Sequence, residues 1–162
     1  MRIAVLSDIH DHLEYLQKAL AAVRDAQVLI CCGDFCAPFT VAAIAEQFSG
    51  PVHCIFGNND GDPFLISQVA GRFDHVTIHG LYAELEFDNR QVAVIHYPKI
   101  ARRLAQAGIF DLVCYGHDHR AHVEQIGKTV LANPGEVMGR FGSPSLGVYD
   151  TTTGEFTHMA VK

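Results

Sequence analysis

The sequence lacks any run of basic residues, and its 12 Lys and Arg are outnumbered by 18 Asp and Glu, so the net charge is -6. Proteins that hold nucleic acid through its backbone need clustered positive charge to neutralise phosphates. The absence of such a cluster argues against a stable nucleic-acid complex. The surplus of carboxylates instead suits a site that concentrates cations.

Long apolar runs are also missing, since none approaches the roughly 20 residues that a membrane span needs. The first apolar run, at residues 2–7, ends at Asp8 and is too short for a signal sequence. No linker, repeat or low-complexity segment interrupts the 162 residues. We therefore expect one domain over residues 1–162, in the cytoplasm and without membrane contact.

Paired cysteine motifs are absent as well. The five cysteines are an odd number, and most lie inside apolar segments. Cys32 and Cys36 have no second close pair with which to form a zinc ribbon. The pattern predicts reduced, buried thiols, as expected of a cytosolic protein.

The first half of the chain alternates between two periodicities. Continuous apolar runs, typical of strands buried on both faces, cover residues 2–7, 28–32 and 52–56. Helical spacing of apolar residues follows each run, at residues 12–24, 38–48 and 62–70. This alternation predicts parallel strands joined by right-handed crossovers.

The second half predicts hairpins instead. Turn residues separate paired strand patterns at 82–87 with 91–96, 122–126 with 128–132, and 145–150 with 155–161. Between the first two hairpins we expect a helix over 99–107 and a buried strand over 112–115. The spacing of Ile100, Leu104 and Ala107 predicts that these side chains face the core. Together the halves indicate an α/β fold with mixed sheets.

Side chains that can bind metal follow five of the predicted strands: Asp8 with His10, Asp34, Asn58, His96, and His117 with His119. Ligand sites of open α/β sheets gather beyond the carboxyl ends of the strands. Glycine precedes a key residue at Gly33, Gly57 and Gly116, where it permits sharp turns and close approach of the backbone. Imidazoles and oxygen donors at one rim predict a transition-metal site.

Each of these residues also has a purely structural explanation. Asp8 or Asp11 could cap the helix that follows, and Asp34 suits a turn. His96 could be a hydrogen-bonded core histidine, and the His117–His119 pair could lie in an exposed polar loop. Turn chemistry explains their joint occurrence at five strand ends much less well than a shared site does.

Taken in order, the blocks Asp8-x-His10, Gly33-Asp34, Gly57-Asn58-x-Asp60, His96 and Gly116-His117-x-His119 span most of the chain. Through them the sequence resembles the calcineurin-like metallophosphoesterases. The short length and Asn133-Pro134-Gly135 are most similar to the bacterial and archaeal phosphodiesterases of the YfcE type. The resemblance implies a four-layer α/β/β/α sandwich.

The resemblance also implies a hydrolase for a small phosphodiester, acting through a hydroxide that bridges two divalent transition-metal ions. Manganese is the first choice of metal, with Ni, Fe, Co or Zn as alternatives. The implied ligands are Asp8, His10 and His119 for the first ion, Asn58, His96 and His117 for the second, and Asp34 for both. The implied catalytic group is Asp34, Asn58, Asn59 and Asp60, where Asp60 acts through hydrogen bonds and not as a ligand. A homo-oligomer is left open.

Two positions depart from the family pattern. Asn59 stands where many members have a histidine that donates a proton to the leaving group, and an amide cannot serve as a general acid near neutral pH. His96 is followed by Tyr97-Pro98, where many members have a glycine nearby. His96 is therefore the least secure of the implied ligands.

Two other functions compete with the small-molecule enzyme. The Vps29-type proteins use the same fold as a non-catalytic scaffold and have lost some ligand histidines, whereas all seven positions here hold competent ligands. Nucleases of the Mre11 type share the five blocks but are longer and carry a DNA-contacting extension. The acidic balance and the short chain argue against a nuclease.

Overall fold

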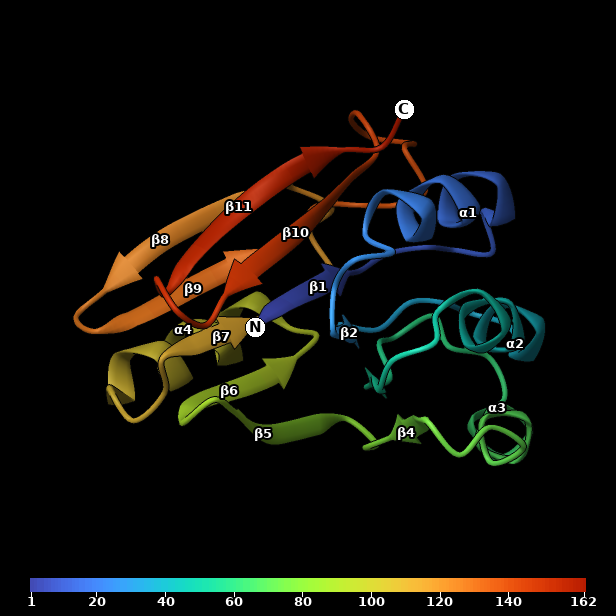
Figure 1. Cartoon of the computed structure of the whole chain (residues 1–162), viewed down its shortest axis with the longest axis horizontal. Coiled ribbons are helices and arrows are strands. Elements are labelled where there is room, and N and C mark those ends of the chain that lie inside the picture. The colour runs from blue at the N-terminus through green and yellow to red at the C-terminus, as the bar shows by residue number, and fades with distance from the viewer.

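The computed structural model describes all 162 residues and has two mixed sheets with helices on their outer faces (Figure 1). The larger sheet has the strand order β11-β10-β1-β2-β3-β4, and the smaller has the order β5-β6-β7-β9-β8. The predicted α/β/β/α sandwich is confirmed. Its layers arise because both faces of the central strands are apolar and must be covered.

The first half of the chain forms most of the larger sheet. Its elements are β1 (Arg2–Leu6), α1 (Leu13–Ala22), β2 (Val28–Cys31), α2 (Pro38–Gln47), β3 (Val52–Cys54), α3 (Pro63–Ala70) and β4 (Val76–Ile78). Strands β1 to β4 pair in parallel, as the alternation of strands and helices predicts. Strand β4 was not predicted, because its three residues at the sheet edge carry too short a pattern.

The second half completes both sheets. Its elements are β5 (Tyr82–Phe87), β6 (Arg90–Ile95), α4 (Pro98–Ala107), β7 (Leu112–Cys114), β8 (His122–Ile126), β9 (Thr129–Asn133), β10 (Ser145–Asp150) and β11 (Glu155–Ala160). The hairpin β5–β6 turns at Asp88 and Asn89, whose φ angles of 50° and 64° are those of a two-residue turn that Asp and Asn tolerate. All three predicted hairpins are present.

Alternate residues of β1 face different layers. Ala4 and Leu6 pack with helices α1 to α3, whereas Ile3 and Val5 join the core between the two sheets. A third cluster packs α4 against the smaller sheet. Every side chain from Ile3 to Leu6 is fully buried, which explains why this strand is continuously apolar and does not alternate.

Helix α4 corrects one prediction about its buried face. Ala101 and Ala105 are buried, Leu104 is half-buried, and Ile100 and Ala107 are exposed. The helix is therefore rotated from the predicted orientation. The small alanine side chains let its backbone approach β6, β7 and β9 closely, whereas the larger Ile100 would hold it away.

Parallel pairing brings the carboxyl ends of several strands to one side of the molecule. Strands β1, β2 and β3 end together in the larger sheet, and β6 and β7 end together in the smaller one. In Figure 1 the arrows of β1 and β6 point toward the same side. The loops that follow these strands therefore meet at one rim that both sheets share.

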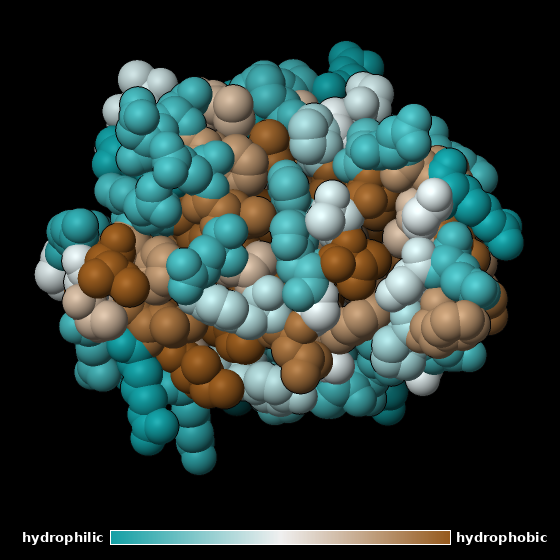
Figure 2. Space-filling view, turned by 90° about the horizontal axis from the view of Figure 1, so that it is seen from below, coloured by the Kyte–Doolittle hydropathy of each residue, from teal (hydrophilic) through white to brown (hydrophobic).

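The outer surface is mixed in character. Figure 2 shows the face that lies below in Figure 1, where hydrophobic residues reach the surface but are interrupted by polar ones. Scattered exposure of this kind is usual for a folded domain. None of the four helices combines the length and the apolar character that crossing a membrane needs.

Candidate metal centre

Residues from both sheets converge at the shared rim. Asp8, which follows β1, lies with His10 and with His119 from the loop after β7, and one potential ligand atom from each residue falls within 4.8 Å of the others. Asp8, Asp34 and His96 form a second such set, and all three of these residues are buried. The structure therefore brings together residues that are more than 100 positions apart in the sequence.

Five of the potential ligand residues at this rim have left-handed backbone conformations. The φ angles are 52° at Asp8, 45° at His10, 54° at Asp34, 75° at His117 and 59° at His119. Such conformations cost free energy for residues other than glycine and persist only where surrounding structure holds them. The clustering of these strained conformations indicates that this is a functional site, where the loops are fixed so that their side chains converge.

Two glycines make room for this packing. A Cβ atom on Gly57 would collide with Asp34 Oδ1, and one on Gly116 would collide with Ser7 Oγ. The backbone at these positions must therefore lie directly against polar groups of the site, which only glycine allows. This close approach explains why glycine precedes Asn58 and His117.

The first donor group consists of Asp8, His10 and His119. Asp8 Oδ2 accepts hydrogen bonds from Ser7 Oγ at 2.6 Å and from the His117 backbone N–H at 3.0 Å. Asp8 Oδ1 lies 3.4 Å from His119 Nε2 and 3.8 Å from His10 Nε2. Asp8 Oδ1 and His10 Nε2 are buried atoms with no hydrogen-bond partner, and they face each other across this group.

The second donor group consists of Asn58, His96 and His117. Asn58 Oδ1 lies 3.1 Å from His96 Nε2 and 2.7 Å from His117 Nδ1, so three potential ligand atoms meet at one point. His96 is fully buried, whereas Asn58 and His117 are exposed. His96 Nδ1 contacts the Cys32 carbonyl at 2.7 Å, as in a hydrogen-bonded core histidine, whereas its Nε2 faces Asn58 Oδ1 and the site.

Asp34 lies between the two groups. Its Oδ2 atom is 3.6 Å from His10 Nε2 in the first group and 3.3 Å from His96 Nε2 in the second. Asn59 donates to Asp34 twice, from its backbone and from its side-chain amide, each at 2.8 Å. Burial raises the pKa of Asp34, but contact with His96 and the bonds from Asn59 outweigh it, so the pKa is well below its ordinary value.

Asp60 supports the loops and points away from the donor atoms. Its carboxylate accepts hydrogen bonds from the backbone N–H groups of Gly57 at 2.6 Å, Cys36 at 2.7 Å and Asp34 at 3.1 Å. Burial raises the pKa of Asp60 despite these bonds. Asp60 therefore joins the loops after β2 and β3 through hydrogen bonds.

The Nδ1 atoms of three histidines contact partners outside the donor groups. His10 Nδ1 contacts Cys36 Sγ at 3.5 Å, His96 Nδ1 contacts the Cys32 carbonyl, and His119 Nδ1 contacts Glu136 Oε2 at 2.8 Å. Each contact leaves Nε2 directed into the site. Partners of this kind orient metal-binding histidines in proteins.

Two groups at the site were missed by the sequence analysis. Glu136 is buried against His119, and Cys36 lies against His10 at the edge of the centre. The one available signal was Asn133-Pro134-Gly135, which immediately precedes Glu136. Asn133 is fully buried, and its side-chain amide donates to the Gly116 carbonyl at 3.1 Å and to Asp118 Oδ1 at 2.6 Å, which supports the loop of His117 and His119.

Asp11 corrects another expectation. It was a candidate cap for the helix that directly follows it, but His12 occupies that position, with its Nδ1 accepting from the Tyr15 N–H at 3.3 Å. Asp11 instead accepts from the Ala37 N–H at 2.9 Å and from Thr40 Oγ1 at 2.6 Å, at the start of α2. Asp11 thus ties the loop after β1 to the loop after β2.

The carboxylates of the centre raise the pKa of two histidines. For His10, the contact with Asp8 raises the pKa more than burial lowers it. For His96, burial lowers the pKa, but Asp34 outweighs that effect and raises it. The centre therefore attracts positive charge, whether carried by a proton or by a metal ion.

The donor set fits a divalent cation. The unpartnered Asp8 Oδ1 and His10 Nε2 can be satisfied together by a cation that accepts both lone pairs. The potential ligand atoms are carboxylate, amide and imidazole atoms, because the nearby Cys36 Sγ contacts the outer nitrogen of His10. A cavity of about 460 Å³ opens beside His119 and is bounded by Phe141 and Arg120.

The chain is similar to known proteins in sequence and in structure. Residues 1–154 match the model of the calcineurin-like phosphoesterase superfamily domain. Phosphodiesterase MJ0936 of Methanocaldococcus jannaschii is 28% identical over 167 residues, which cover 100% of both chains. The structure of an archaeal phosphodiesterase has 27% identity and a TM-score of 0.91, with 99% of each chain covered. YfcE, a phosphoesterase from E. coli, has the same fold, with a TM-score of 0.67 at 19% identity and 100% coverage of both chains.

Proposed function

Because this chain belongs to the calcineurin-like phosphoesterase superfamily, we propose that it is a hydrolase for small phosphodiesters that works with two divalent transition-metal ions. Membership of a metallophosphoesterase family implies divalent metal, and the donor groups described above suit it. The phosphodiester specificity follows the name of the relative that aligns over the whole chain. We further propose that residues 1–162 act as one catalytic domain.

The observation that supports this proposal is that Asp34 Oδ2 lies close to His10 of the first donor group and to His96 of the second. Asp8, His10 and His119 would hold one ion, and Asn58, His96 and His117 would hold the other, with Asp34 shared. Two cations a few Å apart repel each other, and a shared carboxylate offsets that repulsion. When bound, the ions would lower the pKa of water and neutralise charge on the phosphate.

The remaining residues prepare the site. Asp60 would hold the loops after β2 and β3 in place, and Asn59 would orient the Asp34 carboxylate through its two hydrogen bonds. The exposed Asn58 and His117 leave the second group open to an arriving phosphate, whereas the first group is more deeply placed. Manganese is our first choice of metal, since oxygen and imidazole donors without thiolate suit it.

The test is a panel of phosphodiesters and phosphomonoesters assayed with metal-stripped protein that is re-supplied with Mn, Fe, Co, Ni or Zn in turn. We expect hydrolysis of diesters that depends on added metal and requires two ions per chain. A protein that binds metal but hydrolyses no member of the panel would instead favour a scaffold function. Anomalous scattering at the metal edge, with Asp34 between two peaks, is the expected structural result.

A further inference from the structure

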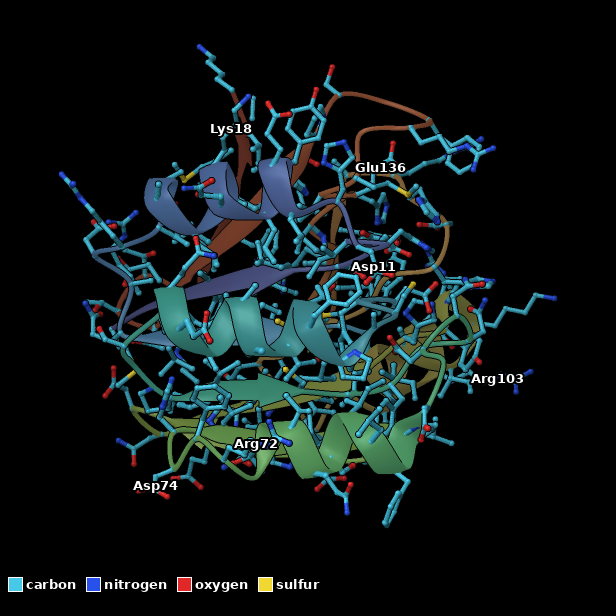
Figure 3. All side chains as sticks on the ribbon, turned by 90° about the vertical axis from the view of Figure 1, so that its right-hand side faces the viewer. Asp11, Lys18, Arg72, Asp74, Arg103 and Glu136 are labelled. Atoms are coloured by element: carbon cyan, nitrogen blue, oxygen red, sulfur yellow. The ribbon has the colours of Figure 1, made fainter.

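Glu136 is a buried carboxylate to which the proposed function assigns no role. It follows Asn133-Pro134-Gly135 after strand β9, and it is 1% exposed. Figure 3 places Glu136 and Asp11 on the same side of the molecule, beside the rim. Its one ionisable partner within 4.0 Å is His119. A buried carboxylate without a Lys or Arg partner must be stabilised by hydrogen bonds, so its hydrogen-bond partners indicate what it does.

The two oxygens of Glu136 have different partners. Oε1 accepts from the backbone N–H groups of Phe141 and Gly142, each at 2.6 Å. Oε2 lies 2.8 Å from His119 Nδ1. Because an ionised carboxylate only accepts hydrogen bonds, His119 Nδ1 must carry the proton in this contact. Nε2 is then the nitrogen with a free lone pair, and it points toward Asp8 Oδ1 at 3.4 Å.

The segment that donates to Glu136 also touches His119 directly. The Phe141 ring packs edge-to-face with the His119 ring, with centroids 5.1 Å apart and an interplanar angle of 87°. Phe141 is otherwise 71% exposed and borders the cavity beside the centre. Two independent contacts thus connect residues 141–142 to the same imidazole.

We propose that Glu136 is a positioning residue that fixes the Nδ1–H tautomer of His119 and joins the Phe141 segment to the metal centre. The role in metal binding rests on the proposed function, whereas the tautomer does not. A fixed tautomer presents the Nε2 lone pair without prior proton transfer. Outer partners of this kind are worth about 10- to 100-fold in metal affinity.

The substitution Glu136→Gln tests this role with almost no change of shape. The glutamine amide has one accepting oxygen and one donating nitrogen. The oxygen must take the place of Oε1, because an amide N–H₂ cannot face the two N–H groups of Phe141 and Gly142. The nitrogen then faces His119 Nδ1, which must become an acceptor, so the proton moves to Nε2 and blocks the metal-binding lone pair.

The direct measurement is the tautomer of His119 by nitrogen-15 NMR of the metal-free protein at about pH 8, where imidazoles are largely neutral. We expect the Nδ1–H form in the unmodified protein and the Nε2–H form in Glu136→Gln. An Nε2–H tautomer in the unmodified protein would overturn the proposal even if the variant does not fold. An unchanged tautomer in a folded variant would do the same.

Metal affinity supplies the second measurement. Calorimetric titration with Mn²⁺ should show a 10- to 100-fold weaker first ion in Glu136→Gln and a smaller effect on the second. Phe141→Ala is the matched control, because it removes the ring that contacts His119 but keeps both N–H donors, and it should leave the tautomer unchanged. If the protein hydrolyses no diester but the tautomer moves as expected, the proposed function fails and this inference stands.

Discussion

The two donor groups differ in how their atoms are satisfied. In the first group, Asp8 Oδ1 and His10 Nε2 are buried without hydrogen-bond partners. In the second, Asn58 Oδ1 already contacts both His96 Nε2 and His117 Nδ1, at 3.1 and 2.7 Å. The first group carries the buried carboxylate of Asp8, whereas Asn58 is neutral and exposed.

Because of this difference, we expect the two proposed ions to bind with unequal affinity. An unsatisfied buried polar atom costs about 1–3 kcal/mol, and a cation that contacts it recovers that free energy. In the second group, a cation must take the place of the contacts that Asn58 Oδ1 already makes with both imidazoles. We therefore expect the first ion to bind more tightly and the second to exchange more readily with solvent.

Asp34→Asn should weaken both ions and have the largest effect, because Asp34 Oδ2 lies against both groups, at 3.6 Å from His10 and 3.3 Å from His96. Each ion can supply several kcal/mol of charge stabilisation in the transition state. At 1.36 kcal/mol for each factor of ten, weakening both corresponds to a loss on the order of 10⁴-fold in kcat/KM. The measurement is diester hydrolysis at saturating metal, together with metal content.

The exposed Asp74 provides a matched control for that substitution, since Figure 3 shows it far from Glu136 and the rim. Asp74→Asn makes the same chemical change and should leave hydrolysis and metal content unaltered. Near-normal turnover of folded Asp34→Asn would contradict a mechanism that needs both ions.

Neither donor group supplies a proton to the leaving group, and substrates with different leaving groups test this. Asn59 donates its side-chain amide to Asp34 Oδ2 and cannot protonate a departing oxygen. General acid catalysis typically contributes about 10²–10⁴-fold, so alkyl diesters should be cleaved more slowly than nitrophenyl diesters by at least that margin. Across aryl diesters, log kcat/KM should fall steeply as the leaving-group pKa rises.

Asn59→His should flatten that dependence if the imidazole reaches the leaving oxygen. A flat dependence in the unmodified protein, with chemistry shown to limit the rate, would mean that another residue donates the proton. His12 would be the next candidate. Its Nδ1 accepts from the Tyr15 N–H, so Nε2 is the nitrogen left to carry a proton.

The rim could be predicted from the sequence because its side chains lie close in sequence to the strands that position them. Asp8 and Asp34 follow apolar runs directly, and such runs form strands whose ends meet when the strands are parallel. The length and composition of each run were enough to predict that side chains from distant parts of the chain would converge. The order of the motifs then added the implied roles, which stay predictions.

The outer partners could not be predicted, because they depend on how the two sheets stack. The Cys32 carbonyl reaches His96 across 64 positions, and Asp11 accepts a hydrogen bond from the N–H of Ala37, 26 residues later in the chain. Local pattern assigned Asp11 to the adjacent helix, since sequence contains no signal for contacts between layers. The rotation of α4 was missed for the same reason: the small Ala101 and Ala105 are buried only because a sheet lies against them.

Single histidine substitutions should separate the two groups. His119→Ala should weaken the first ion and His117→Ala the second, each on the order of 10²-fold or more, because loss of an outer partner alone already costs 10- to 100-fold. Calorimetric titration with Mn²⁺ resolves the two steps. His75→Ala is the control, since His75 bonds the Ala45 carbonyl outside the centre. Equal effects of His119→Ala and His117→Ala on both steps would show that the groups are not separate.

Acidification should release the ions. Two pKa shifts determine the direction in which metal affinity changes with pH. The pKa of His10 is raised by its contact with Asp8, and that of His96 is raised by Asp34 against the effect of burial. A histidine binds metal only after it loses its proton, and a raised pKa means that the proton is held to higher pH. Metal affinity is therefore full above the raised pKa values and falls as the pH drops through them. The decline should begin above the ordinary histidine value of about 6.5 and reach up to about tenfold per pH unit for each histidine.

The same titration also shows which of the two ions is lost at the higher pH. Because each group contains one of these histidines, both ions should be lost, and the weaker second ion should leave at the higher pH. Titration with Mn²⁺ between about pH 5.5 and 8 measures both steps around the reference value. Hydrolysis should decline with the second ion, and added metal should partly restore it, since protons and metal compete for the same nitrogen atoms. Acid inactivation that does not respond to metal concentration would exclude histidine ligation as its cause.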